Sequence, residues 1–136
     1  MQQNTQGQVY LKEGNMKQVL SLKKLVKENE NFRKVIASGK HTQVVLMSLA
    51  PGAELGDELH PAIDQLFLIE DGKGEMVLDG KPLPVEEHDG AFVPAGTMHN
   101  LRNLGKKPLK FCTIYSPPAH APDTVQKIAP KVAIKV

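Results

Sequence analysis

From Phe32 onward, the chain alternates between short apolar runs and turn residues, with a turn roughly every 8 to 12 positions. This spacing is typical of strands that build a barrel or a sandwich, so the sequence predicts an all-β fold with a largely antiparallel sheet. Asp79-Gly80 lies between two short runs and predicts a tight hairpin, because both central residues of such a turn take positive φ. The expected strands are Phe32–Ala37, Gln43–Leu49, Gln65–Ile69, Glu75–Leu78, Lys81–Val85, Ala91–Val93 and Leu109–Tyr115.

One short helix is expected before the strands. Ser21 is a suitable N-cap, and Leu22, Leu25 and Val26 fall on one face of a helix that would end near Asn29. After the last strand, Pro117-Pro118 removes two ladder donors and ends the sheet. The sequence thus predicts an N-terminal arm over residues 1–40 that packs its helix on a barrel over 41–118, followed by a tail over 119–136. We expect the end of this tail to be frayed or bound by a partner, with an edge strand as the alternative.

The composition is that of one ordinary globular domain of 136 residues with a single cysteine. This excludes a disulfide scaffold, and we interpret Cys112 as a core thiol rather than a nucleophile, because no base is apparent near it. No apolar run approaches the roughly 20 residues that cross a bilayer, and the N-terminus lacks the apolar stretch of a secretion signal. A cytoplasmic location is therefore expected.

The net charge of +2 hides an uneven distribution. Residues 1–40 carry eight basic and three acidic residues, 41–100 two and eleven, and 101–136 seven and one. An anionic middle segment suits a bound cation better than a nucleic acid or an anionic membrane surface. The lysines occur singly or in pairs without interleaved aromatic residues, so a nucleic-acid interface is not expected.

Two polar clusters interrupt the apolar pattern, at residues 56–65 and 94–100. Glu58 and His60 are two positions apart, so in extended backbone both side chains lie on one face and Leu59 lies on the other. Pro61 resets the alternation, which allows Gln65 to face inward in the following strand. Taken alone, Glu58 and His60 could form a surface charge pair, and His99 could donate a hydrogen bond inside a turn, but together the clusters have a recognisable spacing.

The spacing of these clusters resembles the two motifs of the cupin superfamily. The first motif is a glycine, five residues, His-x-His, three or four residues, a glutamate, six residues and a glycine. The second is a glycine, five residues, Pro-x-Gly, two residues, a histidine, three residues and an asparagine. The matching positions here are Gly52, Glu58, His60, Gln65 and Gly72, and then His88, Pro94, Gly96, His99 and Asn103. The exit Tyr115-Ser116-Pro117-Pro118 is similar to that of a small single-domain cupin subgroup.

This resemblance implies a double-stranded β-helix barrel with four metal ligands, which would be Glu58, His60, Gln65 and His99. Two imidazoles, a carboxylate and an amide suit one divalent zinc, iron, manganese or nickel ion. If Gln65 does not bind, the remaining three form a two-His, one-carboxylate triad. Asp64 is the alternative to Gln65, since the motif allows a three-residue gap, but only Gln65 keeps six residues before Gly72. A barrel without metal that keeps a polar pocket is the other interpretation.

The resemblance leaves the function open between two classes. The first is an enzyme of dioxygenase, isomerase or decarboxylase type that acts on a small oxygen-bearing metabolite, with Glu58 bound to the metal or acting as a general base. The second is a non-catalytic module that binds or senses a small ligand. Cupins commonly dimerise, so a homodimer is expected, and Gln8–Leu11 could add to a neighbouring sheet edge. His41, His88 and His120 are expected to be exposed, although His120 could also reach the barrel mouth.

Overall fold

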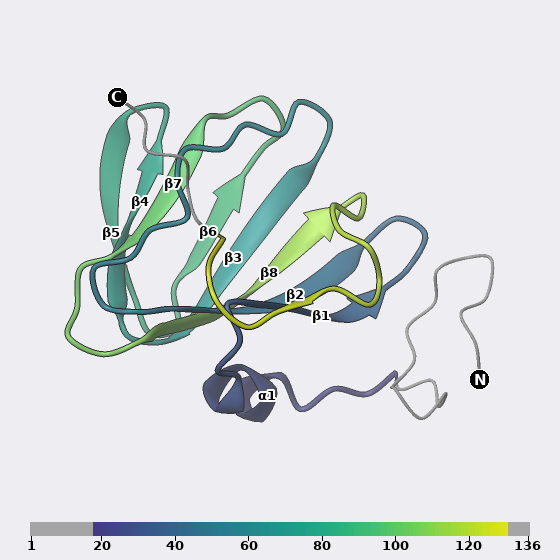
Figure 1. Cartoon of the computed structure of the whole chain (residues 1–136). Coiled ribbons are helices and arrows are strands. Elements are labelled where there is room, and N and C mark those ends of the chain that lie inside the picture. The colour runs from purple at the N-terminus through teal and green to yellow at the C-terminus, as the bar shows by residue number, and fades with distance from the viewer. Residues whose placement is uncertain (1–17, 131–136) are drawn as a thin grey trace.

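The computed structural model describes residues 18–130, and strands dominate this part of the chain (Figure 1). The helix α1 spans Leu22–Glu28. The strands are β1 (Arg33–Ser38), β2 (Gln43–Leu49), β3 (Asp64–Asp71), β4 (Lys73–Leu78), β5 (Lys81–Glu86), β6 (Gly90–Val93), β7 (His99–Asn103), β8 (Leu109–Ser116) and β9 (Val125–Gln126). The predicted all-β class is confirmed. The helix within the described range, residues 18–130, is too short to cross a membrane.

The strands form a six-stranded sheet with the order β6-β3-β8-β2-β1-β9 and a three-stranded sheet with the order β5-β4-β7. All neighbouring strands in both sheets are antiparallel, as expected from the hairpin signals. In Figure 1 the small sheet lies on the left, and the large sheet runs from β6 at the centre to β1 on the right. Apolar side chains from both sheets meet in one buried cluster, so the sheets enclose a common interior.

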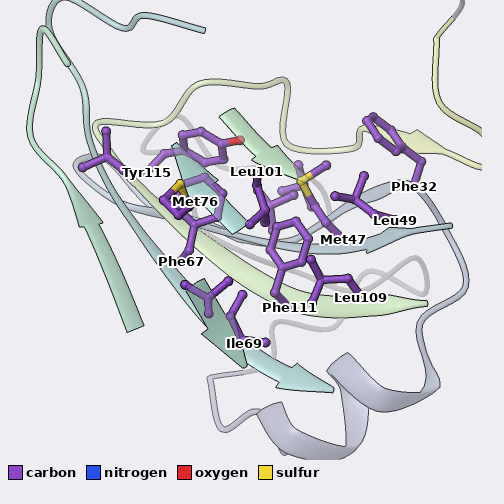
Figure 2. Close-up of a cluster of buried hydrophobic side chains, with 14 residues drawn as sticks. Phe32, Met47, Leu49, Phe67, Ile69, Met76, Leu101, Leu109, Phe111 and Tyr115 are labelled. Atoms are coloured by element: carbon purple, nitrogen blue, oxygen red, sulfur yellow. The ribbon is translucent and has the colours of Figure 1, made fainter. Parts of the chain in front are cut away.

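The interior changes from polar to apolar along the central strands. At one end, the register aligns Gln43 of β2 with Tyr115 of β8, and Tyr115 with Gln65 of β3. At the other end, Leu49 lies opposite Leu109. Figure 2 shows Tyr115 and Leu109 at opposite ends of the same row. Each large apolar side chain buried at the apolar end contributes about 1.5–3 kcal/mol, so this end stabilises the barrel while the other presents polar groups.

The helix α1 covers the outer face of the large sheet. Its Val26 packs with Leu46 and Cys112, whose side chains point away from the barrel interior, and all three are buried. The predicted apolar face of the helix is thus confirmed. The expected role of Ser21 is only half right: it stands at the N-cap position, but its side chain makes no capping hydrogen bond.

Asp79 and His88 are the two residues other than glycine with positive φ in the described part of the chain. Asp79 and Gly80 have φ of 47° and 82° between β4 and β5, which confirms the predicted hairpin. His88 has φ of 74°. Since His88 stands where the second motif has a glycine, the left-handed backbone explains why that motif calls for a residue without Cβ.

The predicted strands all form, with shifts of one or two residues at some ends. Two described strands, β7 and β9, were not expected. The strand β1 precedes the expected boundary at residue 40 yet pairs along β2 within the large sheet. The division into arm, barrel and tail remains a prediction. The expectations for Gln8–Leu11 and for the last six residues lie outside the described part of the chain.

Candidate metal centre

Glu58 lies in a short extended segment beside the first residue of β7. It forms an isolated antiparallel bridge with His99, in which each backbone N–H donates to the other's carbonyl at 2.8 Å. The alternation predicted from sequence is present: Leu59 points outward and is exposed, whereas Glu58 and His60 are half-buried on the other face. The carboxylate and the imidazole of these two residues therefore approach the same point.

His60 is held at the barrel mouth by its backbone and its ring neighbours. Its carbonyl accepts a hydrogen bond from the Gly96 N–H at 2.9 Å, which ties the two motif loops together. The ring centroid lies 5.4 Å from that of His99 and 6.1 Å from that of Tyr115. His60 Nε2 is buried and has no hydrogen-bond partner among residues 18–130.

His99 begins β7 and is 1% exposed. Its Nδ1 lies 3.0 Å from the carbonyl oxygen of Thr97, and since a carbonyl only accepts, Nδ1 carries the hydrogen. Nε2 is then an acceptor with a free lone pair, and it too lacks a partner among residues 18–130. In metal-binding histidines, a hydrogen bond from the ring nitrogen that does not bind the metal fixes the tautomer and the ring orientation. The Phe67 ring packs edge-on against the His99 ring, with their centroids 6.0 Å apart.

Gln65 and Asp64, the two alternatives for the fourth position, lie on opposite faces of β3. Gln65 is 1% exposed and its Nε2 donates to Thr113 Oγ1 at 2.8 Å. Its Oε1 is buried and unpartnered within the described range, residues 18–130. Asp64 is exposed, and its carboxylate accepts a hydrogen bond from the Ala95 N–H. Gln65 therefore faces the barrel interior, whereas Asp64 faces outward.

The structure brings Glu58, His60 and His99 into one group whose ligand atoms lie within 4.8 Å of one another. Glu58 Oε1 is 3.7 Å from His60 Nε2 and 3.8 Å from His99 Nε2. These separations are too long for hydrogen bonds. They are close to the roughly 3.4 Å between ligand atoms that a tetrahedral ion with bonds of about 2.1 Å requires. The donor set and its spacing thus fit a divalent transition metal.

Two buried titratable side chains, Tyr115 and Cys112, lie on opposite faces of β8. Burial raises the pKa of Tyr115 to about 12, although the nearby side chains of Arg33 and Gln65 act in the opposite direction. Tyr115 is therefore a neutral phenol at the polar end of the interior. Burial, together with the charge of Glu70, raises the pKa of Cys112 to about 11, and the thiol is buried under α1. A core thiol is what the sequence predicted.

The other histidines divide into two groups. His41 and His88 are exposed, as expected. His120 is not: it is half-buried with its ring 5.2 Å from that of Tyr115, which corrects the expectation that it is exposed. The cause is Gln43, whose Oε1 accepts from the backbone N–H groups of Ala119 and His120 and whose Nε2 donates to the His120 carbonyl.

Arg33 is a further polar residue of the interior that the sequence did not indicate. It is 9% exposed and shares a face of β1 with Val35, which belongs to the apolar core. The only available signal was the alternation itself, which places a charged residue two positions before an inward valine.

The family model for the cupin domain matches residues 45–115, more than half of the chain, and the chain belongs to the cupin family. This confirms both the resemblance and the cupin fold. The chain is 41% identical over 116 residues to the uncharacterized protein YrkC of Bacillus subtilis, covering 80% of this chain and 62% of YrkC. It therefore spans less than two thirds of that relative.

Two solved structures are also similar. The protein BH2720 of Bacillus halodurans superposes with a TM-score of 0.80 at 37% identity, covering 84% of this chain and 91% of that one. A predicted oxalate decarboxylase from Thermotoga maritima gives a TM-score of 0.54 at 25% identity, covering 62% and 69% of the two chains. The family and its fold are thus established, together with a group of side chains suited to a metal.

Proposed function

We propose that this protein binds one divalent transition metal through Glu58, His60, Gln65 and His99 and acts there on a small oxygen-bearing metabolite. The reaction would be of dioxygenase, isomerase or decarboxylase type. The metal would be zinc, iron, manganese or nickel, because the donors are imidazole nitrogens and oxygens.

The observation that carries the proposal is a set of three buried polar atoms without hydrogen-bond partners. His60 Nε2, His99 Nε2 and Gln65 Oε1 are all buried without a hydrogen-bond partner in the described part of the chain. Leaving a buried acceptor unpaired costs about 1–3 kcal/mol. Three such atoms at one end of one barrel, with a carboxylate beside two of them, are best explained by a cation that they share.

A divalent metal at this point would supply Lewis acidity toward an oxygen atom of the ligand. The chain's own groups have separate roles. The Thr97 carbonyl accepts a hydrogen bond from His99 Nδ1, which leaves Nε2 as the ring nitrogen that would bind the metal. Thr113 orients the Gln65 amide so that its oxygen faces away from the Thr113 hydroxyl. The Glu58 side chain is 32% exposed, so it can also accept a proton from a ligand that enters from the mouth.

The relatives give limited support for the choice of reaction. The Thermotoga protein is described as a predicted oxalate decarboxylase, which is consistent with a small oxygen-rich ligand in a related barrel. The 25% identity does not extend that substrate to this chain. A decarboxylase is therefore one of three reaction types to test.

A non-catalytic binding or sensing module is the second candidate function. This candidate is favoured because the group of Glu58, His60 and His99, found among residues 18–130, contains a single carboxylate, that of Glu58. If Glu58 remains bound to the metal, the group offers no second carboxylate as a base. Ligand binding without turnover is the result that this candidate predicts.

The test of the proposal is elemental analysis of protein purified without added metal or chelator. We expect about one equivalent of a single transition metal in the parent protein. Glu58→Ala and His99→Ala should each lose it, because each removes one of a few ligands. The matched controls are Glu87→Ala and His88→Ala, which remove an exposed carboxylate and an exposed imidazole elsewhere on the surface.

Parent protein without metal, even after incubation with Fe²⁺, Mn²⁺, Ni²⁺ and Zn²⁺, would contradict the proposal. So would full occupancy in the His99→Ala variant. With the metal established, oxygen uptake and product analysis with small chelating acids separate an enzyme from a binding module. The cytoplasmic location and the homodimer remain predictions, to be checked by fractionation and by light scattering.

A further inference from the structure

Arg33 places a permanent positive charge inside the barrel without a carboxylate to balance it. The side chain is 9% exposed, and no aspartate or glutamate within residues 18–130 forms an ion pair with it. One Nη donates to the Gln126 side-chain oxygen, while Nε is buried with no partner in the described range. A desolvated guanidinium of this kind is costly unless an anion pairs with it.

The guanidinium lies over the ring of Phe32, 5.0 Å from its centroid, and reaches the side chain of Tyr115 from there. It is close enough to Tyr115 to oppose the rise in the pKa of that hydroxyl, as does the Gln65 side chain. Its charge also reaches His120, whose ring packs edge-on against Tyr115 at 5.2 Å. Arg33, Tyr115 and His120 therefore form one cluster, which we call the arginine cluster.

The arginine cluster adjoins the proposed metal group through Tyr115. The His60 ring lies 6.1 Å from the Tyr115 ring, and Gln65 sits beside Tyr115 in the register of β3 and β8. The Glu58 carboxylate is near enough to influence the pKa of the Tyr115 hydroxyl. Tyr115 is therefore the residue that the arginine cluster and the proposed metal group share as a neighbour.

The position of His120 in the arginine cluster is fixed by a buried residue, Gln43. Gln43 is fully buried and uses both atoms of its amide to hold the backbone at Ala119 and His120. Its Nε2 also donates to the Ser38 hydroxyl at 3.1 Å. Gln43 is a positioning residue, which keeps the His120 ring against Tyr115.

We propose that the arginine cluster of Arg33, Tyr115 and His120 binds the carboxylate group of the ligand whose other oxygen lies at the Glu58, His60, Gln65 and His99 group. This inference rests on the proposed function and adds the substrate class: a small carboxylic acid with a second oxygen. A guanidinium presents paired N–H donors that match the two oxygens of a carboxylate. The Tyr115 hydroxyl adds a neutral donor. Because the ligand must carry both a carboxylate and a second oxygen, neutral sugars and alcohols are excluded as preferred ligands.

The test compares two probes of the same size, the anion glycolate and its neutral amide, glycolamide. Dissociation constants are measured by NMR titration of ¹⁵N-labelled protein, once metal-free and once loaded with Zn²⁺. We expect the parent protein to bind glycolate at least about 10-fold more tightly than glycolamide in both forms, since a charged hydrogen-bond pair is worth about this much or more. In Arg33→Met the preference should disappear, whereas Arg102→Met, which removes an exposed arginine on β7, should keep it.

Arg33→Lys serves if the methionine variant does not fold. Lysine retains the positive charge but lacks the paired N–H donors of the guanidinium, so glycolate binding should weaken by about 10-fold relative to the parent. Glycolate binding that is unchanged in both Arg33 variants would overturn the inference, even with Zn²⁺ bound as proposed. Conversely, protein that fails to bind Zn²⁺ yet shows the Arg33-dependent preference in its metal-free form would overturn the proposed metal site and support the anion site.

Discussion

Glu58 and His99 are joined through their backbones, and their side chains face each other across the site. Their N–H and carbonyl groups form a reciprocal pair at 2.8 Å, and Glu58 Oε1 lies 3.8 Å from His99 Nε2. The relative position of a carboxylate and an imidazole is therefore set by strand pairing and not by long flexible side chains alone. Sites supported in this way by regular structure hold ligand atoms more reproducibly than sites on free loops.

Removing the metal should lower the thermal stability of the parent protein. A ligand that binds only the folded state adds about 2.7 kcal/mol when present at 100 times its dissociation constant. We expect a chelator to lower the melting temperature of the parent protein and to leave that of His99→Ala unchanged. Calorimetry with and without chelator measures this. The exposed His88→Ala variant should behave like the parent, and an equal response in both histidine variants would contradict the account.

Gln65→Glu should tighten metal binding and weaken the metal-free fold. The new carboxylate adds a charged ligand, but without the ion it is a buried charge that costs about 2 kcal/mol or more. Chelator competition measures the affinity, and urea unfolding of the metal-free form measures the stability. Asp64→Asn is the matched control on the outer face of β3 and should change neither quantity. A larger effect at Asp64 than at Gln65 would reverse the assignment.

The stability of the protein should depend on pH through His120. Burial, reinforced by the charges of Arg33 and His60, lowers the pKa of His120 to about 4 from an ordinary value of 6.5. Between these values the unfolded chain binds more protons than the folded one, so the free energy of unfolding falls as pH drops through this range. His120→Phe keeps a ring against Tyr115 and removes the titration. Urea unfolding between pH 7 and pH 4 should show a shallower decline in this variant, and parallel curves would contradict the expectation.

His88→Gly should stabilise the protein slightly. His88 has φ of 74°, a conformation that costs a residue with a Cβ about 1–2 kcal/mol. Glycine removes that strain but adds about 0.4–1 kcal/mol of unfolded-chain entropy, so the expected net gain is about 0.5–1 kcal/mol. Its side chain is 65% exposed, and its contacts with Glu70 and Glu87, at 3.9 and 3.5 Å, contribute little. Chemical denaturation of the parent and of His88→Gly measures the two free energies of unfolding, and a lower value for His88→Gly would contradict the prediction.

Most of the fold could be predicted from local signals. Apolar alternation located the strands from β1 to β6 and β8, and Asp79-Gly80 located a hairpin, because these features depend on neighbouring residues alone. The motif spacing also placed Glu58, His60 and His99 in one group before any contact was known. Extended backbone explains why Glu58 and His60 share a face, whereas the place of His99 beside them was implied by the resemblance to the cupin motifs.

What the sequence could not indicate depends on distant contacts or on polar residues that face inward. The strand β7 has the sequence HNLRN, in which only Leu101 is apolar, so its alternation is invisible although four of its five residues are buried. His120 is half-buried because Gln43, 77 positions earlier, holds its backbone. Arg33 is buried in the interior of β1, where its charge has no sequence neighbour to explain it.

The most direct test of the central claim is a crystal structure of the metal-loaded protein, with anomalous data collected on both sides of the metal's absorption edge. The account predicts one anomalous peak about 2.0–2.3 Å from His60 Nε2, His99 Nε2, a Glu58 carboxylate oxygen and Gln65 Oε1. A peak held by other residues would contradict it, as would an empty site in protein that elemental analysis shows to carry the metal.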